Sequence, residues 1–314
     1  MKPQMSVKFA GLTLRNPVIA ASGTFGYGVE FEEILNLDRI GGFVTKGLSW
    51  EPMAGNPAPR LIETPAGMIN SIGLQNIGVE AFIKDKLPAL RRHAGAACIA
   101  NVFGYQVRDY VAVVEALNDA DGVSAYELNV SCPNTQHGGM VFGTETGILD
   151  QLITRVKAIA KRPVIVKLSP NVTSIAEMAR CAESAGADAL SLVNTFVALS
   201  IDVESRRPRI ANVTGGLSGP AIKPIAVRMV YEAAQAVSIP ICGIGGIASA
   251  QDAVEFLLAG ATAVQVGSAS YADPRAVERI AQSLARWCAR RQVSRVSELI
   301  GALKVTPDSE AGRV

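Results

Sequence analysis

Strong net charge, long apolar runs and paired cysteines are all missing from this 314-residue sequence. The formal net charge is +2, so no strong electrostatic field attracts nucleic acid or an anionic membrane. No apolar run approaches the roughly 20 residues that a membrane span requires. Residues 1–11 lack the apolar stretch of a signal peptide. We therefore expect a cytoplasmic protein that binds neither nucleic acid nor membrane.

Metal-binding patterns are also absent from the sequence. Its five cysteines are scattered and never form a C-x-x-C pair: Cys98, Cys132, Cys181, Cys242 and Cys288. This spacing excludes a zinc ribbon or an iron–sulphur cluster in the chain, and it is typical of reduced thiols. The two histidines, His93 and His137, lie outside any H-E-x-x-H motif. We expect no metal site.

The sequence is rich in apolar residues, which make up 49% of it, and this excludes a disordered chain. Short β-branched runs alternate with longer amphipathic ones. The predicted strands are 17–22, 43–48, 99–104, 125–132, 163–169, 189–195, 240–246 and 263–269. Helical patterns are clearest at 79–94, 106–119, 147–162 and 220–237. Eight strand–helix units predict an α/β fold with a single (β/α)8 TIM barrel. The alternative, an open doubly wound sheet, more often has fewer strands and an early glycine-rich turn.

The spacing of the strands leaves three insertions, at roughly 49–76, 133–146 and 196–219. Each follows a strand, which places it on the C-terminal face of the barrel, where active sites of this fold lie. Residues 6–16 alternate about Ala10-Gly11 and predict an N-terminal hairpin at the opposite end. We expect residues 1–314 to form one domain, with residues from about 302 to 314 as a flexible tail.

Glycines at two strand ends predict a phosphate site. Gly243-Ile-Gly-Gly-Ile-Ala248 matches the dinucleotide fingerprint G-x-G-x-x-A, but the next strand ends in Gly267-Ser268, where a ribose-binding acid would be expected. The loops after strands seven and eight of a barrel commonly bind phosphate, and Gly219 precedes a helix that adds to the same cradle. The alternative is plain turn glycines. Phosphate binding without a ribose acid favours flavin mononucleotide (FMN) or a sugar phosphate over NAD.

Polar residues also mark the C-terminal ends of the predicted strands. Burying them in apolar strands costs free energy unless a partner satisfies them. Lys167 would neutralise charge on the N1–C2=O edge of a reduced flavin. Its structural alternative is an ion pair with Glu127. The full set is Ser22, Gly23, Lys46, Asn101, Asn129, Lys167, Asn194 and Thr195.

Cys132 stands apart from the other cysteines because it ends the fourth strand, in a proline-containing loop between Asn129 and Asn134. A cysteine there acts as a general base or as a nucleophile. No histidine is placed by the sequence to activate a nucleophile. Proton abstraction is therefore the better interpretation.

In combination these motifs resemble the dihydroorotate dehydrogenase family, from about residue 6 to residue 301. Cysteine at position 132 separates the chain from the membrane-attached class, which has serine as its base. The run Gln136-His-Gly-Gly-Met-Val-Phe-Gly143 is similar to class 1B, the NAD-linked branch, more than to the fumarate-linked class 1A. The other motifs are Asn16-Pro-Val-Ile-Ala-Ala-Ser-Gly-Thr-Phe-Gly26, Thr45-Lys-Gly-Leu-Ser49, Asn70-Ser-Ile-Gly-Leu-Gln-Asn76, Asn129-Val-Ser-Cys-Pro-Asn134, Val166-Lys-Leu-Ser-Pro170, Val193-Asn-Thr195 and Gly215-Gly-Leu-Ser-Gly-Pro220.

The resemblance implies oxidation of dihydroorotate to orotate in de novo pyrimidine (UMP) biosynthesis. Cys132 would take a proton from C5 while C6 delivers hydride to FMN, and Lys46 would pair with the orotate carboxylate. The implied substrate-binding residues are Lys46, Asn70, Ser71, Ile72, Gly73, Leu74, Asn129, Asn134, Asn194 and Thr195. The implied FMN-binding residues are Ser22, Gly23, Thr45, Lys46, Asn101, Asn129, Lys167, Val193, Gly219, Gly245, Gly246, Gly267 and Ser268.

The chain has neither an NAD-binding fold nor cluster cysteines. The resemblance therefore implies a heterotetramer, in which a homodimer of this chain binds an iron–sulphur flavoprotein subunit that carries FAD and a [2Fe–2S] cluster and reduces NAD+. Three alternatives stay open. They are a stand-alone class 1A-like enzyme that uses fumarate, a dihydropyrimidine-dehydrogenase-like FMN barrel, and a sugar-phosphate aldolase with Lys167 as a Schiff base.

Overall fold

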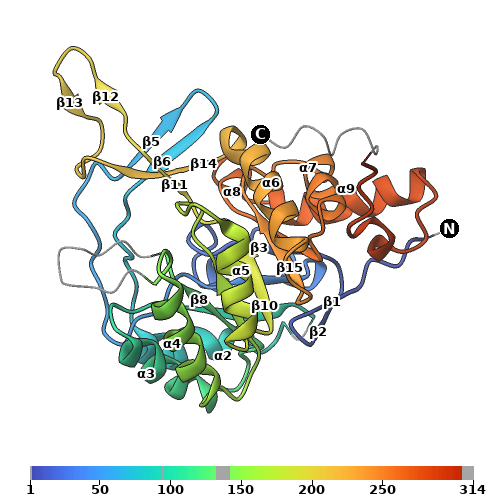
Figure 1. The fold of residues 1–314 in the computed structure, drawn as a ribbon, viewed down its shortest axis with the longest axis horizontal. Coiled ribbons are helices and arrows are strands. Elements are labelled where there is room, and N and C mark those ends of the chain that lie inside the picture. Colours follow the sequence, from blue (N-terminus) through green and yellow to red (C-terminus); the bar gives the residue numbers. More distant parts are fainter. Residues whose placement is uncertain (1, 94, 132–141, 306–314) are drawn as a thin grey trace.

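The computed structural model describes residues 2–93, 95–131 and 142–305. Cys132, Asn134 and the part of the predicted tail from residue 306 onward lie outside the described residues. Within the described chain, eight parallel strands close into a barrel in the order β10-β15-β16-β3-β4-β7-β8-β9 (Figure 1). The predicted TIM barrel is confirmed.

All eight predicted strands are present, and each ends before its predicted boundary, although Asn101, Asn129 and Lys167 still lie within their strands. Strands β9, β10, β15 and β16 are buried along their whole length, as expected of parallel strands covered on both faces. The barrel strands are β3 Val18–Ala20, β4 Gly42–Val44, β7 Ala97–Val102, β8 Ala125–Asn129, β9 Val164–Lys167, β10 Ala189–Leu192, β15 Ile241–Ile244 and β16 Ala263–Val266.

Helices surround the barrel (Figure 1). The predicted helix 79–94 is divided by a π-helical turn, η3, at Phe82–Lys86, and it ends at Leu90. Pro88 explains the interruption, because it has no N–H to donate to the preceding turn. The helices are α1 Val79–Ala81, α2 Leu87–Leu90, α3 Val107–Asn118, α4 Thr146–Lys157, α5 Ile175–Ser184, α6 Lys223–Ala234, α7 Ala250–Leu258, α8 Ala269–Ala272 and α9 Ala276–Arg290, with 3-10 turns η1 Val29–Phe31, η2 Leu37–Arg39, η4 Pro220–Ile222 and η5 Val296–Leu299. No helix among the described residues combines the length and apolar character that crossing a bilayer requires.

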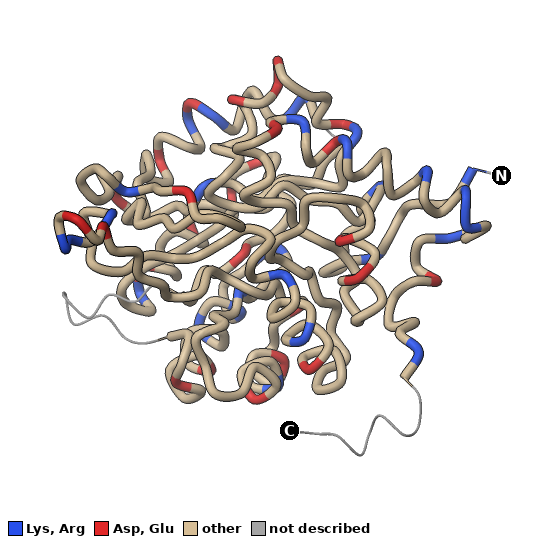
Figure 2. Tube along the Cα trace, turned by 90° about the horizontal axis from the view of Figure 1, so that it is seen from above, with Lys and Arg blue, Asp and Glu red and all other residues tan. Residues whose placement is uncertain are grey.

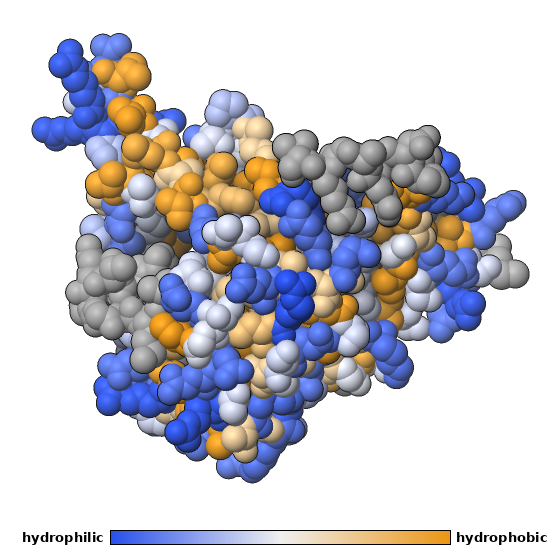
Figure 3. Space-filling view, viewed as in Figure 1, coloured by the Kyte–Doolittle hydropathy of each residue, from blue (hydrophilic) through white to orange (hydrophobic). Residues whose placement is uncertain are grey.

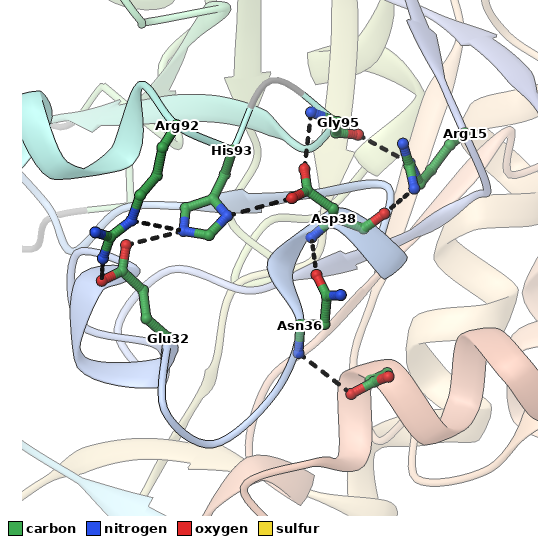
Figure 4. Close-up of polar contacts among 8 residues, drawn as sticks. Arg15, Glu32, Asn36, Asp38, Arg92, His93 and Gly95 are labelled. Atoms are coloured by element: carbon green, nitrogen blue, oxygen red, sulfur yellow. Dashed lines mark hydrogen bonds and ion pairs between the residues drawn. The ribbon is translucent and has the colours of Figure 1, made fainter.

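The predicted hairpin precedes the first barrel strand, and a polar cluster joins two of the segments that lead into barrel strands. Strands β1 (Val7–Phe9) and β2 (Leu12–Leu14) pair antiparallel, and Ala10 and Gly11 make the turn with positive φ. In the polar cluster, His93 lies between two carboxylates, with Nε2 2.9 Å from Glu32 and Nδ1 3.4 Å from Asp38 (Figure 4). These contacts join segments that precede strands β4 and β7, so His93 has a structural role far from the mouth.

The first and third insertions contain strands that the sequence did not predict. Strands β5 (Leu61–Thr64), β6 (Gly67–Asn70), β14 (Gly215–Ser218) and β11 (Phe196–Ala198) form one antiparallel sheet. A short ribbon of β12 (Ile201–Asp202) and β13 (Arg207–Pro208) continues it. Figure 1 shows the sheet and ribbon rising from the C-terminal side of the barrel as an arm.

Surface chemistry differs between the arm and the rest of the molecule. Lys and Arg are interspersed with Asp and Glu along the described trace, without a broad region of one sign (Figure 2). The arm, in contrast, exposes apolar side chains, among them Val197 at 63% and Val203 at 77% (Figure 3). Leu199, Ile201 and Val213 are exposed on the same segment.

Candidate active site

The arm sheet brings together two predicted substrate-binding residues that are far apart in the sequence. Gly216 pairs with Asn70 on one side and with Val197 on the other. The Asn70 amide donates to the Gly216 carbonyl at 3.3 Å. A Cβ on Gly216 would lie 2.1 Å from Thr195 Oγ1. Asn70 and Thr195 therefore flank Gly216, and no larger residue fits between them.

Two further predicted amides contact each other at the ends of β8 and β10. Asn194 Nδ2 donates to Asn129 Oδ1 at 3.1 Å, and the Thr195 N–H donates to Asn194 Oδ1 at 2.8 Å. These bonds fix which end of each amide faces the mouth. Asn171, which the sequence analysis missed, donates to the Thr195 carbonyl at 3.2 Å and accepts from the Val197 N–H at 3.1 Å. It supports the same turn from the β9–α5 loop.

The loop from Ser71 to Leu74 extends this side of the mouth. Gly73 and Leu74 both have positive φ, and a Cβ on Gly73 would lie 2.5 Å from Asn56. Asn56 donates to the Ser71 carbonyl at 2.9 Å and so holds the loop. Ser71 Oγ is buried and has no partner among the described residues, which leaves a hydroxyl for a ligand.

Lys46 supplies positive charge just after β4. Burial lowers the pKa of its ammonium group, and the nearby Arg60 guanidinium lowers this pKa further, while Glu30 raises it. Two cations near one partly buried position favour an anion there. The lysine is therefore placed to bind a carboxylate.

Three predicted glycines form a cradle at the other side of the mouth. Gly219, Gly245 and Gly246 all have positive φ. A Cβ on Gly246 would lie 2.8 Å from the Gly219 carbonyl and 3.1 Å from the Lys223 backbone nitrogen, at the start of helix α6. Gly267, after β16, has no atom closer than 3.5 Å to such a Cβ. The positive φ values and the close packing at Gly246 require glycine, and a glycine turn of this kind lets the backbone approach a phosphate.

A buried polar cluster lies between the two sides, inside the barrel. Glu127 is fully buried, and its Oε1 accepts from Asn101 Nδ2 at 2.8 Å. Its Oε2 accepts from Ser191 Oγ at 2.9 Å and from Gln265 Nε2 at 2.7 Å. Lys167 Nζ lies 3.8 Å from Glu127 Oε1, so the ion pair weighed for Lys167 is present, but beyond hydrogen-bond distance. Ser191 and Gln265 were not predicted as site residues, although Gln265 interrupts the apolar strand β16.

These residues fit a flavin with a phosphate tail. Asn101 Oδ1 is buried without a partner among the described residues, and a Cβ on Gly23 would meet no atom within 4 Å. Ser22 and Gly23 follow β3, and Val193 follows β10 with its N–H bonded to the Ile244 carbonyl. Thr45 Oγ1 accepts from the Asn101 N–H at 3.0 Å. An orphaned acceptor, open space and a phosphate cradle thus meet at one end of the barrel.

The four described cysteines are unsuited to act as bases. Burial raises the pKa of Cys98 to about 12. Burial, followed by the charge of Glu127, raises the pKa of Cys242 well above its usual value. Burial also raises the pKa of Cys181 and Cys288. These thiols stay protonated at neutral pH.

The fit at Gly216 gives a first prediction. Gly216→Ala is expected to weaken orotate binding about 10–100-fold, because the added methyl group displaces Thr195 with an overpacking cost of roughly 1–3 kcal/mol. FMN content should not change. Gly147→Ala is the matched control, since a Cβ at Gly147 meets no atom within 4 Å. Calorimetric titration of both variants tests the prediction, and wild-type affinity in Gly216→Ala would contradict it.

Comparison with known proteins gives a consistent family. The family model described as dihydroorotate dehydrogenase matches residues 4–287. The chain is similar, at 58% identity, to a Solibacter usitatus protein named, with a provisional qualifier, dihydroorotate dehydrogenase A (fumarate); the match covers 97% of this chain and 100% of that protein. It is 56% identical to the dihydroorotate dehydrogenase B (NAD(+)) catalytic subunit of Trichlorobacter lovleyi, with the same two coverages. It is 55% identical to the protein of that name from Geobacter sulfurreducens, over 97% of this chain and 99% of the relative.

Proposed function

The chain belongs to the dihydroorotate dehydrogenase family, and from that premise we propose that it oxidises dihydroorotate to orotate in de novo pyrimidine biosynthesis, with FMN as its cofactor. One observation carries the proposal. The barrel mouth joins a partly buried cation, a set of oriented amides and a glycine phosphate cradle within one site. We place the reaction in the cytoplasm, where free thiols such as those of the four described cysteines stay reduced.

Each side of the mouth has a role in this reaction. Lys46 binds the orotate carboxylate. The pyrimidine ring presents amide N–H and carbonyl groups, which suit the donor and acceptor ends of Asn70, Asn129 and Asn194. Cys132 removes the C5 proton as general base. Asn134 and the loop from Ser71 to Leu74, together with Thr195, complete the substrate set.

FMN supplies the hydride acceptor when it is bound. Gly219, Gly245, Gly246, Gly267 and Ser268 would hold its phosphate. Asn101 and Lys167 would contact the ring, together with Ser22, Gly23, Thr45 and Val193 at the neighbouring strand ends. Membership of this family and the contact of Lys167 with Glu127 leave no support for Lys167 as a Schiff base in an aldolase.

For the electron acceptor, we propose NAD+, reached through a partner subunit with FAD and a [2Fe–2S] cluster. Relatives at 56% and 55% identity are named as NAD(+) catalytic subunits. The exposed apolar side chains of the arm, Val197 and Val203 among them, are unusual for a protein without partners and suit a homodimer within a heterotetramer. Fumarate is the second candidate acceptor, because the relative at 58% identity bears that name.

Assays of the chain purified alone and together with its partner subunit distinguish NAD+ from fumarate as the electron acceptor. Whichever acceptor is used, dihydroorotate is expected to bleach the flavin absorbance of the single chain. Sustained NAD+ reduction should require the iron–sulphur flavoprotein subunit, because this chain has no cluster cysteines. Rapid fumarate reduction by the single chain would overturn the NAD+ proposal and support the second candidate. A chain that purifies without flavin and binds no FMN would overturn the enzyme proposal itself.

A further inference from the structure

We propose that Glu127 is a positioning residue that sets the hydrogen-bond polarity of the flavin site, by forcing Asn101 to present its carbonyl oxygen to the flavin. The inference rests on the proposed binding of FMN. It concerns a residue that has no place in the reaction described above and does not reach the substrate.

The buried hydrogen bonds fix this polarity. Glu127 receives donors from three different strands: Asn101 from β7, Ser191 from β10 and Gln265 from β16. In these three bonds both carboxylate oxygens of Glu127 act as acceptors. The Asn101 amide must therefore turn its NH2 group toward Glu127. Its Oδ1 is left facing the other way.

The freed oxygen lies beside the loop that follows strand β4. Asn101 Oδ1 lies 3.1 Å from the position of a Cβ on Gly47, the residue directly after Lys46. It is buried and has no partner among the described residues. A buried acceptor without a partner is costly, so its place is best explained by a ligand that donates to it.

The chemistry of FMN supplies one matching group. The oxidised isoalloxazine ring has a single N–H donor, at N3, between two carbonyl groups. The N3–H group needs a hydrogen-bond acceptor such as the Asn101 carbonyl oxygen. If the Asn101 NH2 group stood there instead, two donors would face each other. Glu127 thus selects FMN binding indirectly, through the orientation of Asn101.

Glu127→Gln should reverse this orientation. Two short bonds, from Ser191 and Gln265, hold an oxygen at the Oε2 position, while one amide bonds at Oε1. The introduced glutamine keeps the bonds from Ser191 and Gln265 without rotation of either side chain when its oxygen stays at the two-donor end. Its NH2 then faces Asn101, which must flip and present NH2 to the flavin.

The test compares FMN with N3-methyl-FMN, each titrated into apoprotein by flavin fluorescence quenching. Wild-type protein is expected to bind FMN about tenfold or more tightly than the methylated analogue, the worth of one buried hydrogen bond. Glu127→Gln should lose most of this preference. The double variant Glu127→Gln with Asn101→Asp should regain it, because the introduced glutamine then donates its NH2 to the introduced aspartate, whose second oxygen again accepts.

The controls separate polarity from folding. Glu278→Gln makes the same change at a different carboxylate, on helix α9. Glu278 accepts hydrogen bonds from Arg39 and from Gln282, and this variant should keep the wild-type preference for FMN over N3-methyl-FMN. If Glu127→Gln fails to fold, the double variant still decides, since it keeps one carboxylate and one amide in the pair. The inference is overturned if Glu127→Gln keeps the full preference for FMN over N3-methyl-FMN. It is also overturned if the double variant or the wild-type protein shows no such preference. Failure of wild type to bind FMN overturns the proposed function instead.

Discussion

Cys132→Ser is expected to keep FMN bound while the rate of flavin reduction by dihydroorotate falls about 10²–10⁴-fold at neutral pH, the usual contribution of a general base. A serine hydroxyl is a far weaker base than a thiolate. A cysteine thiol ordinarily has a pKa near 8.5 and is mostly protonated at pH 7. The wild-type rate should therefore rise with pH as the thiolate forms, and this rise should be missing in the variant. Stopped-flow absorbance at several pH values measures both effects.

Cys181→Ser is the matched control for this substitution. The Cys181 thiol is half-buried and donates to the Thr146 carbonyl at 3.2 Å, a bond that a serine hydroxyl can keep. The control should retain the wild-type rate and pH profile. FMN content, read from the absorbance of each sample, separates loss of chemistry from loss of cofactor. A Cys132→Ser rate within about threefold of wild type would contradict the assigned role, because removing a general base costs far more.

The barrel was predictable because its strands are buried on both faces. Strands such as Val164–Lys167 and Ala189–Leu192 are continuous apolar runs with one polar residue, and the alternation with helices then implies a parallel sheet. The arm sheet was not predictable. Gly67–Asn70 and Gly215–Ser218 contain glycines that disfavour strands. Their pairing is stabilised by partners more than a hundred residues away, at Asn70 and Gly216.

The same distinction applies to the site. Residues such as Lys46, Asn101 and Asn194 were predicted because parallel strands end at one face of a barrel. Which of these side chains contact each other depends on the stagger of neighbouring strands and on closure of the barrel. Glu127 accepts hydrogen bonds from Ser191, which is 64 positions away in the sequence, and from Gln265, which is 138 positions away. The sequence offers Glu127 as a partner for Lys167, yet its hydrogen bonds go to other residues.

Lys46→Gln is expected to weaken orotate binding about 10²–10³-fold, because removing one partner of a desolvated charge pair costs roughly 2–5 kcal/mol. Binding of uracil, which has the same ring edges without the carboxylate, should be weak in wild type and unchanged by the substitution. This difference separates a dihydroorotate site from a dihydropyrimidine-dehydrogenase-like site. Competition titrations with the two ligands on FMN-loaded protein measure it. Tight uracil binding by wild type would favour the latter.

The ion pair also predicts a pH dependence. Only the protonated lysine attracts a carboxylate, so orotate affinity should fall as pH rises through the pKa of Lys46. Burial and the charge of Arg60 lower this pKa, so the fall should begin below the usual range for lysine. Arg60→Gln removes one of the two causes and should move the fall to higher pH. Lys157→Gln is the matched control, because Lys157 pairs with Asp188 at 2.6 Å, ahead of strand β10 and at the opposite end of the barrel. If Lys46→Gln binds orotate as Lys157→Gln does, the carboxylate is bound elsewhere in the mouth.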